Sequence, residues 1–149
     1  MNLTFKKYSP AQTVGLYEKE TIINFLHKHL DEFGDEKEDI SKCMEYALNA
    51  GKHPGGMVLS AWDGDTLVAA TITNRTGMDG YIPANILVYI ATHSDYRGKG
   101  VGKQLVSKVF DETDGDIALH VEPNNPAKFL YEKLGFTNKY LEMRWERPA

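Results

Sequence analysis

The sequence contains a single cysteine, Cys43, among its 149 residues. An internal disulfide therefore cannot form, and a metal cluster held by several cysteines is excluded. Long apolar runs are also missing, since none approaches the roughly 20 residues of a membrane-spanning helix. The first residues lack the hydrophobic segment of a signal peptide. Together these absences predict a soluble, cytoplasmic protein without a membrane partner.

An excess of positive charge is absent as well. The chain has 17 Lys and Arg against 21 Asp and Glu, which gives a formal net charge of -4. This balance argues against a nucleic-acid partner and leaves room for a cationic small substrate. A hydrophobic content of 42% is ordinary for globular proteins. At this length we expect one domain over residues 1–149.

The apolar pattern predicts a mixed α/β fold. Alternation over residues 3–8 indicates a half-buried strand, and Ser9-Pro10 predicts the start of a helix that reaches about residue 30. A charged connection and a second helix, which Gly51 ends, follow. Further strands are predicted at 57–62, 67–73, 86–91 and 117–121, and a last apolar run at 140–145 is expected to close the sheet. The remaining helices are predicted at 101–110, with Phe110 in the buried stripe, and at 127–134.

A glycine-rich turn separates the strand at 86–91 from the helix that follows it. It reads Tyr96-Arg97-Gly98-Lys99-Gly100-Val101-Gly102-Lys103. The first N–H groups of a helix have no internal partner, and alternate glycines let the backbone approach a phosphate closely. The spacing does not satisfy the dinucleotide fingerprint G-x-G-x-x-G or the P-loop pattern G-x-x-x-x-G-K-[ST]. The turn therefore predicts a phosphate site of another kind.

The order Arg97-Gly98-x-Gly100-x-Gly102 resembles the pyrophosphate loop of the GNAT superfamily of acetyl-CoA-dependent N-acetyltransferases. Residues 90–96 are similar to the strand end and bend before that loop, with Ser94 where proline is common. A second signature, Val121-x-x-Asn124-x-x-Ala127-x-x-x-Tyr131-Glu132-Lys133-Leu134-Gly135-Phe136, lies downstream. The resemblance implies a mixed, mostly antiparallel central sheet that is splayed at the cofactor site, with about four helices.

This resemblance also implies a function and its residues. Acetyl-CoA would donate an acetyl group, without a metal, to a primary amine of a small molecule or protein. Backbone groups on the strand would pair with the pantetheine arm, and the amides of the loop would hold the pyrophosphate. The cofactor-binding positions it implies are Ile90, Ala91, Thr92, Arg97, Gly98, Lys99, Gly100, Val101, Gly102, Lys103 and Asn124.

Two catalytic residues are expected. The resemblance places Tyr131 near the cofactor sulfur, where its hydroxyl could protonate the leaving thiolate, although its position on an apolar helix face also suits a core residue. Many relatives carry a glutamate on the strand at 86–91, but this strand has no acid. His120, on the next predicted strand, is the candidate base, with a satisfied histidine on the sheet face as the equal alternative. Glu122 is a weaker candidate.

Alternatives remain open at three points. The acidic residues between positions 31 and 39 suit either a solvated loop or the binding of a polyamine. The short C-terminal end suggests a more open acceptor site or one completed by a second chain, as in a homodimer. Finally, the chain could be a non-catalytic acyl-CoA-binding sensor or interaction module, while a nucleotide-binding module is disfavoured by the loop spacing.

Overall fold

The computed structural model describes residues 1–12, 14–49 and 51–149. The chain divides into two compact units, Met1–Leu119 and His120–Ala149. The first unit contains every strand that the structure describes and three of the helices. Its elements are β1 (Leu3–Tyr8), α1 (Leu16–His29), η1 (Asp31–Phe33), α2 (Lys37–Leu48), β2 (Gly56–Asp63), β3 (Thr66–Arg75), β4 (Asn85–Thr92), η2 (Ser94–Tyr96), α3 (Val101–Glu112) and β5 (Ile117–Leu119). The second unit contains α4 (Ala127–Lys133).

The five strands form one sheet in the order β1-β2-β3-β4-β5. The first four strands pair antiparallel, whereas β4 and β5 pair parallel. A parallel pair needs a crossover, and α3 supplies it. The mixed, mostly antiparallel sheet with four helices that the sequence predicts is therefore confirmed.

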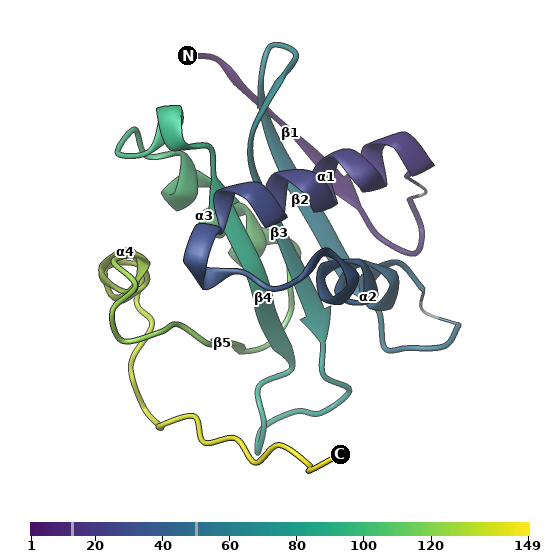
Figure 1. The fold of residues 1–149 in the computed structure, drawn as a ribbon, viewed down its shortest axis with the longest axis vertical. Helices are drawn as coiled ribbons and strands as arrows, with labels where there is room; N and C mark the ends of the chain where they lie inside the picture. The colour runs from purple at the N-terminus through teal and green to yellow at the C-terminus, as the bar shows by residue number, and fades with distance from the viewer. Residues whose placement is uncertain (13, 50) are drawn as a thin grey trace. The chain divides into compact units, whose positions relative to one another are not determined.

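Helices cover both faces of the sheet. Figure 1 shows α1 and α2 in front of it and α3 behind it. One hydrophobic cluster joins α1 and α2 to the sheet through residues such as Ile22, Leu26 and Ile40. The other joins α3 through Val101, Leu105 and Val109. These three residues repeat at i, i+4 and i+8, so they form one apolar stripe.

Two predictions about the helices are wrong. Phe110 lies beyond the edge of the α3 stripe and is 39% exposed. The first helix begins at Leu16 after an extended Gly15, and Ser9-Pro10 does not start it. Instead, the backbone of Ser9 pairs with that of Gln12 in a local turn. The predicted helix also ran through Thr13, which lies outside the described residues.

The end of the sheet differs from the prediction in two ways. The fifth strand stops at Leu119 rather than at residue 121, because its pairing with β4 ends where Leu87 faces Leu119. The apolar run at 140–145 forms no strand, and Leu141, Met143 and Trp145 are exposed. A strand needs a paired neighbour, and the unit His120–Ala149, which the structure describes throughout, contains none.

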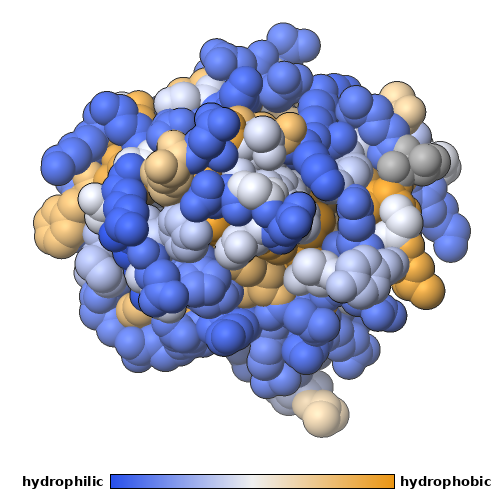
Figure 2. Space-filling view, turned by 90° about the horizontal axis from the view of Figure 1, so that it is seen from above, coloured by the Kyte–Doolittle hydropathy of each residue, from blue (hydrophilic) through white to orange (hydrophobic). Residues whose placement is uncertain are grey.

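The surface of the molecule is mainly polar where Figure 2 shows it, and hydrophobic side chains are seen there only as small patches. This is the expected outcome where helices cover the apolar faces of a sheet. Within the described residues, no helix is long and apolar enough to cross a membrane.

The glycine that begins β2 gives a test of the sheet packing. A Cβ atom at Gly56 would overlap the backbone carbonyl oxygen of Thr73 on β3. We expect Gly56→Ala to lower the free energy of unfolding by about 1–3 kcal/mol, because backbone must move to admit the methyl group. Denaturant unfolding measures the change.

A matched control is Gly15→Ala. Nothing lies within 4 Å of a Cβ at Gly15, and its φ of -69° suits alanine. This variant should stay much closer to the wild-type stability than Gly56→Ala, because the preference for glycine over alanine at an N-cap is offset in part by the lower entropy of the unfolded chain. Equal stability of the two variants would contradict the described pairing of β2 with β3.

Candidate active site

Strand β4 is irregular at its centre. Its register on β3 shifts between Ile72 and Thr73, so that Tyr89 faces Ile72, Leu87 faces Thr73, and Val88 is the extra residue. The buried hydroxyl of Thr71 donates a hydrogen bond to the carbonyl of Tyr89, 2.7 Å away. A bulge of this kind bends a strand and changes which of its residues point toward each neighbour.

Beyond the bulge, β4 has one unpaired edge within Met1–Leu119. Pairing with β5 covers only Asn85 to Leu87. His93 donates its N–H to Val68 on β3 at 2.8 Å, and alternate residues of an antiparallel ladder point the same way. Ala91 therefore faces β3, while the backbone groups of Ile90 and Thr92 face away from it. Exposed N–H and C=O groups of this kind can pair with an extended ligand.

The glycine loop, defined as residues 97–103, follows this edge. Gly98 and Gly100 have φ values of 76° and 79°, a left-handed conformation that favours glycine. No atom lies within 4 Å of a Cβ built at either residue, so backbone conformation is what requires glycine there. The first hydrogen bond within α3 runs from Gln104 N to Gly100 O, at 3.1 Å.

Three amides of α3 precede that first hydrogen bond. They belong to Val101, Gly102 and Lys103, at the positive end of the α3 dipole. A groove of about 430 Å³ continues from here along α3. It is lined by Phe5, Gly100, Lys103, Gln104, Ser107, Lys108 and Asp111. The loop and groove together offer backbone donors, lysine charge and open space to an anion.

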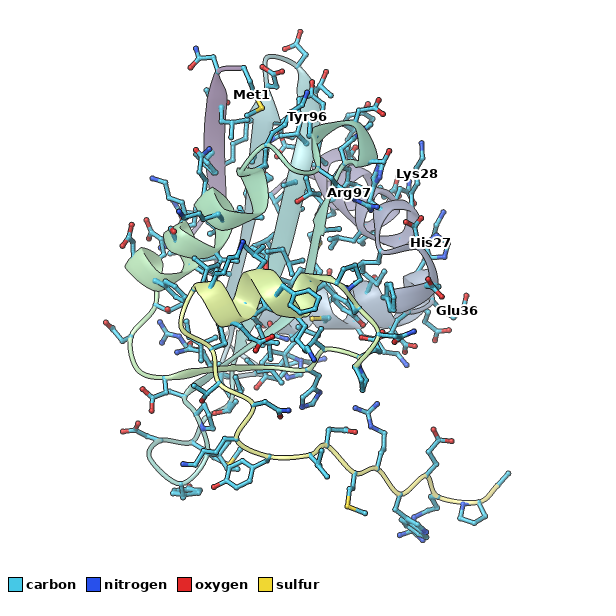
Figure 3. All side chains as sticks on the ribbon, turned by 90° about the vertical axis from the view of Figure 1, so that its left-hand side faces the viewer. Met1, His27, Lys28, Glu36, Tyr96 and Arg97 are labelled. Atoms are coloured by element: carbon cyan, nitrogen blue, oxygen red, sulfur yellow. The ribbon has the colours of Figure 1, made fainter. Side chains whose placement is uncertain are left out.

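The two remaining cations of the loop are placed differently. Lys99 Nζ lies 5.4 Å from the centre of the Tyr96 ring and stays beside the loop. The side chain of Arg97 contacts α1, because its Nη2 donates to the carbonyl of His29 at 2.8 Å. Figure 3 labels Arg97 and Lys28, which precedes His29 in α1. The cofactor-binding prediction for Arg97 came from its position in the motif, and the structure directs its guanidinium toward α1.

Tyr131 lies in the unit His120–Ala149, and the end of α4 fixes its position there. Gly135 has φ 103°, Phe136 N–H donates to Tyr131 O at 3.0 Å, and Gly135 N–H donates to Glu132 O at 3.1 Å. This is the Schellman arrangement of a helix end, with its usual hydrophobic contact. Here that contact joins the rings of Tyr131 and Phe136, whose centres are 6.0 Å apart. The signature from Tyr131 to Phe136 thus encodes a helix stop.

Burial raises the pKa of Tyr131 to about 12, and the Glu122 carboxylate adds to the shift. The phenol is therefore neutral at any physiological pH and can act as a hydrogen-bond donor. Glu122 is thus an electrostatic neighbour of Tyr131.

The other predicted residues of this unit are at the surface. His120 is exposed and lies just past the end of β5, so it is not on the strand where the sequence predicted it. Asn124 is exposed in the turn before α4. The neighbouring Asn125 accepts a hydrogen bond from Ala127 N–H at 3.0 Å and so braces the first turn of α4.

The sequence did not predict a contact between β4 and the connection from α1 to α2. The buried Tyr89 donates its hydroxyl hydrogen bond to Asp35 Oδ2, 2.5 Å away. Burial, and then this bond, raise the pKa of Tyr89. No local pattern links residues 54 positions apart, although a tyrosine within an apolar strand does suggest a satisfied hydroxyl. The contact brings an exposed carboxylate to β4 beside the bulge.

Metal-binding side chains are not gathered at this site. Within residues 1–12, 14–49 and 51–149, no group of three or more His, Cys, Asp and Glu is placed to hold a metal ion.

These features define a fold in which a helix start with free amides follows a strand edge that is unpaired beyond Leu87. A family model described as an acetyltransferase (GNAT) domain matches residues 54–138, more than half of the chain. The chain therefore belongs to the GNAT acetyltransferase family, and it is an acyltransferase by that membership. No curated protein matches the chain.

Solved structures share this fold. An aminoglycoside acetyltransferase from an uncultured soil metagenomic sample is 15% identical, with a TM-score of 0.69 over 99% of this chain and 100% of that one. The ribosomal-protein-S18-alanine N-acetyltransferase of Escherichia coli is 18% identical, with a TM-score of 0.67 over 90% and 78%. An aminoglycoside N-acetyltransferase in complex with CoA is 16% identical, with a TM-score of 0.71 over 99% and 96%. At these identities the likeness shows the fold alone.

A histidine pair lies where α1 ends beside β4. The rings of His29 and His93 are 4.5 Å apart, and His29 also contacts Phe25 at 4.5 Å. His29 is only 8% exposed. Burial lowers its pKa, and His93, Lys28 and Arg97 lower it further, against a smaller opposite effect of Asp31. Protonation of His29 therefore opposes folding.

This histidine makes stability depend on pH. Between its lowered pKa in the folded state and the ordinary value near 6.5, the unfolded chain binds a proton that the folded protein excludes. The free energy of unfolding should therefore fall as pH drops through about 6.5, and His29→Gln should reduce that slope. Urea unfolding at several pH values measures it. The control is His27→Gln on the exposed side of α1, which should keep the wild-type slope, and an unchanged slope in His29→Gln would refute the assignment.

Proposed function

We propose that the protein is an N-acetyltransferase that moves an acetyl group from acetyl-CoA to a primary amine of a small molecule or protein. Transfer occurs by direct attack within a ternary complex. The observation that carries the proposal is the glycine loop, whose helical amides follow the unpaired edge of β4 after the short turn η2. One ligand that needs both an anion site and a strand edge is coenzyme A, because it joins a pyrophosphate to an arm with two amides.

The donor is held mainly by backbone groups in this proposal. The backbone groups of Ile90 and the N–H of Thr92 pair with the amides of the pantetheine arm, while the Thr92 carbonyl accepts from Arg97 Nε. Ala91, which faces β3, keeps the strand in place. The amides of Gly98 to Lys103 bind the pyrophosphate, aided by the charges of Lys99 and Lys103. The groove along α3 leaves room for the nucleotide. We also propose Asn124 as a cofactor-binding residue, as its place in the second signature implies.

The chemistry requires a neutral amine and a protonated leaving group. The amine nitrogen attacks the thioester carbonyl, a backbone N–H stabilises the developing oxyanion, and the C–S bond then breaks. The nitrogen loses one proton and the sulfur gains one, so the transfer has no net uptake or release of protons. Tyr131, whose pKa is raised to about 12, is protonated before transfer and gives its proton to the sulfur as the C–S bond breaks. The proton that the amine releases through the base then returns the phenol to its neutral form.

The acceptor is a cationic amine in this proposal. The acidic connection between α1 and α2 carries Asp35, whose exposed carboxylate is fixed by Tyr89 beside the β4 bulge. Asp35 has no ion-pair partner among the described residues, so its negative charge is available to a second ammonium group of the acceptor. A polyamine or another amine with several positive charges meets this requirement.

Release of free thiol from acetyl-CoA, measured with a panel of monoamines, diamines and polyamines, tests the function. The proposal expects turnover, with a higher kcat/KM for the polycationic amines. CoA binding without turnover of any amine would support the alternative of a non-catalytic acyl-CoA-binding sensor or interaction module. Equal kcat/KM values across the panel would refute the preference for polyamines but would support the acetyltransferase activity.

The proposed role of Tyr131 predicts a defined kinetic change. Tyr131→Phe should lower kcat by about 10²-fold, the usual scale for loss of a positioned acid. The ring contact with Phe136 survives, so the melting temperature and the KM for acetyl-CoA should stay near wild type. Tyr140→Phe, at an exposed tyrosine of the same unit, is the control. A wild-type kcat in Tyr131→Phe would show that Tyr131 has no catalytic role and serves only in packing.

For the general base we propose His120, with Glu122 as the weaker candidate. His120→Ala should lower kcat/KM at neutral pH, and the deficit should vanish above the pKa of the acceptor amine, because a neutral amine needs no base. His27→Ala, another exposed histidine, should leave the pH–rate profile unchanged. A wild-type profile in His120→Ala would eliminate it.

Three further proposals accompany this function. The protein acts in the cytoplasm, forms a homodimer in which a second chain completes the acceptor site, and folds as one domain over residues 1–149. Fractionation of cells, light scattering and limited proteolysis test them in turn.

A further inference from the structure

Arg97 makes three contacts that lead away from the glycine loop. Its Nε donates to the carbonyl of Thr92 at 3.3 Å. Its Nη2 donates to the carbonyl of His29 at 2.8 Å and lies 3.5 Å from Asp31 Oδ2. The side chain thus bridges the end of β4, the end of α1 and the first residue after the α1 cap.

The partners of Arg97 are two carbonyl oxygens and one carboxylate, and its guanidinium supplies hydrogen-bond donors and a positive charge to them. The carbonyl of Thr92 points away from β3, at the unpaired edge of β4. The carbonyl of His29 belongs to the last turn of α1, where helical carbonyls have no internal partner and the dipole is negative. Asp31 has φ 52°, an uncommon left-handed conformation for a residue other than glycine. The ion pair with Asp31 is exposed, so the two carbonyl contacts are the stronger part of the bridge.

The residues next to Arg97 brace the same junction. The ring of His93 packs at a tilt against that of His29, and its Nδ1 accepts the Asp95 N–H, 3.1 Å away. Tyr96 donates to Asp63 at the end of β2, 3.0 Å away, and its backbone N–H donates to His93 O. Figure 3 labels Tyr96 and Arg97 in this segment and Lys28 near the end of α1. The start of the glycine loop is therefore fixed on two sides before any ligand binds.

We infer that Arg97 is a positioning residue, which holds the glycine loop, the end of β4 and the connection after α1 in one arrangement. The inference rests on the proposed function, in which the glycine loop binds acetyl-CoA and the connection between α1 and α2 borders the site of the amine. A motif position alone would make Arg97 a ligand of the pyrophosphate. The three contacts give its guanidinium a different role. It holds the acetyl-CoA site and the amine site at the distance and orientation that the attack requires.

Two acetyl donors distinguish a positioning role of Arg97 from a role as a pyrophosphate ligand. S-acetylpantetheine carries the same thioester as acetyl-CoA but lacks the pyrophosphate. As a positioning residue, Arg97→Gln should lower kcat about tenfold with both donors, while the KM for acetyl-CoA changes less than twofold. As a pyrophosphate ligand, it should lower kcat/KM with acetyl-CoA only. Lys103→Gln is the comparison variant and should affect acetyl-CoA alone.

A conservative variant sharpens the test. Arg97→Lys keeps the charge but loses the planar fork that reaches two carbonyls and a carboxylate together. It should leave kcat as low as Arg97→Gln does, with a melting temperature near wild type for both. Full recovery of kcat in Arg97→Lys would overturn the inference, because charge would then suffice. A large fall in melting temperature with wild-type kcat would overturn it as well, since the role would be structural only.

Hydrogen exchange of the protein without substrates gives a readout that is independent of the proposed activity. Arg97→Gln should speed exchange at the amides of Leu30, Phe33 and Tyr96, which lie on both sides of the bridge. Unchanged exchange there would overturn the inference even if acetyl transfer is confirmed. Absence of acetyl transfer by the wild-type protein with every amine would instead refute the proposed function, and the exchange result would still decide the role of Arg97.

Discussion

Pairing along β4 stops at its centre, and the arrangement of the candidate site depends on that interruption. The extra residue Val88 bends the strand, and β5 accompanies it only as far as Leu87. Unpaired backbone groups are costly unless water or a ligand satisfies them. The Thr92 carbonyl accepts from Arg97 Nε, and the other backbone groups of Ile90 and Thr92 on this edge can still bond to a ligand. One short turn, η2, separates this edge from the glycine loop.

The glycine loop complements this edge because it offers donors of a different kind. Left-handed glycines at positions 98 and 100 turn the chain so that α3 begins with its amides exposed. In the proposed complex, β4 therefore binds the extended amide-bearing arm and the glycine loop binds the pyrophosphate. GNAT membership, shown by the family model, and the fold shared with solved acetyltransferases agree with this reading.

Polar contacts between residues far apart in the sequence position the connection between α1 and α2 beside β4. Tyr89 with Asp35, and Arg97 with His29 and Asp31, tie the connection after α1 to β4. The pair of His29 and His93 beside them adds sensitivity to pH, because burial lowers the pKa of His29. A connection that the sequence presents as a charged loop is thus attached to the strand at two points.

The sequence by itself determined the elements whose causes are local. Alternation fixed β1, the i, i+4 stripe fixed α3, and the glycines fixed the loop, while Leu134-Gly135-Phe136 encoded the Schellman end of α4. Only the tertiary structure decided what depends on distant partners: where β5 ends, that residues 140–145 form no strand, that Phe110 is exposed, and where the guanidinium of Arg97 lies. Local patterns state which conformation a segment prefers, but strand ends and side-chain partners are set by what the rest of the chain brings to them.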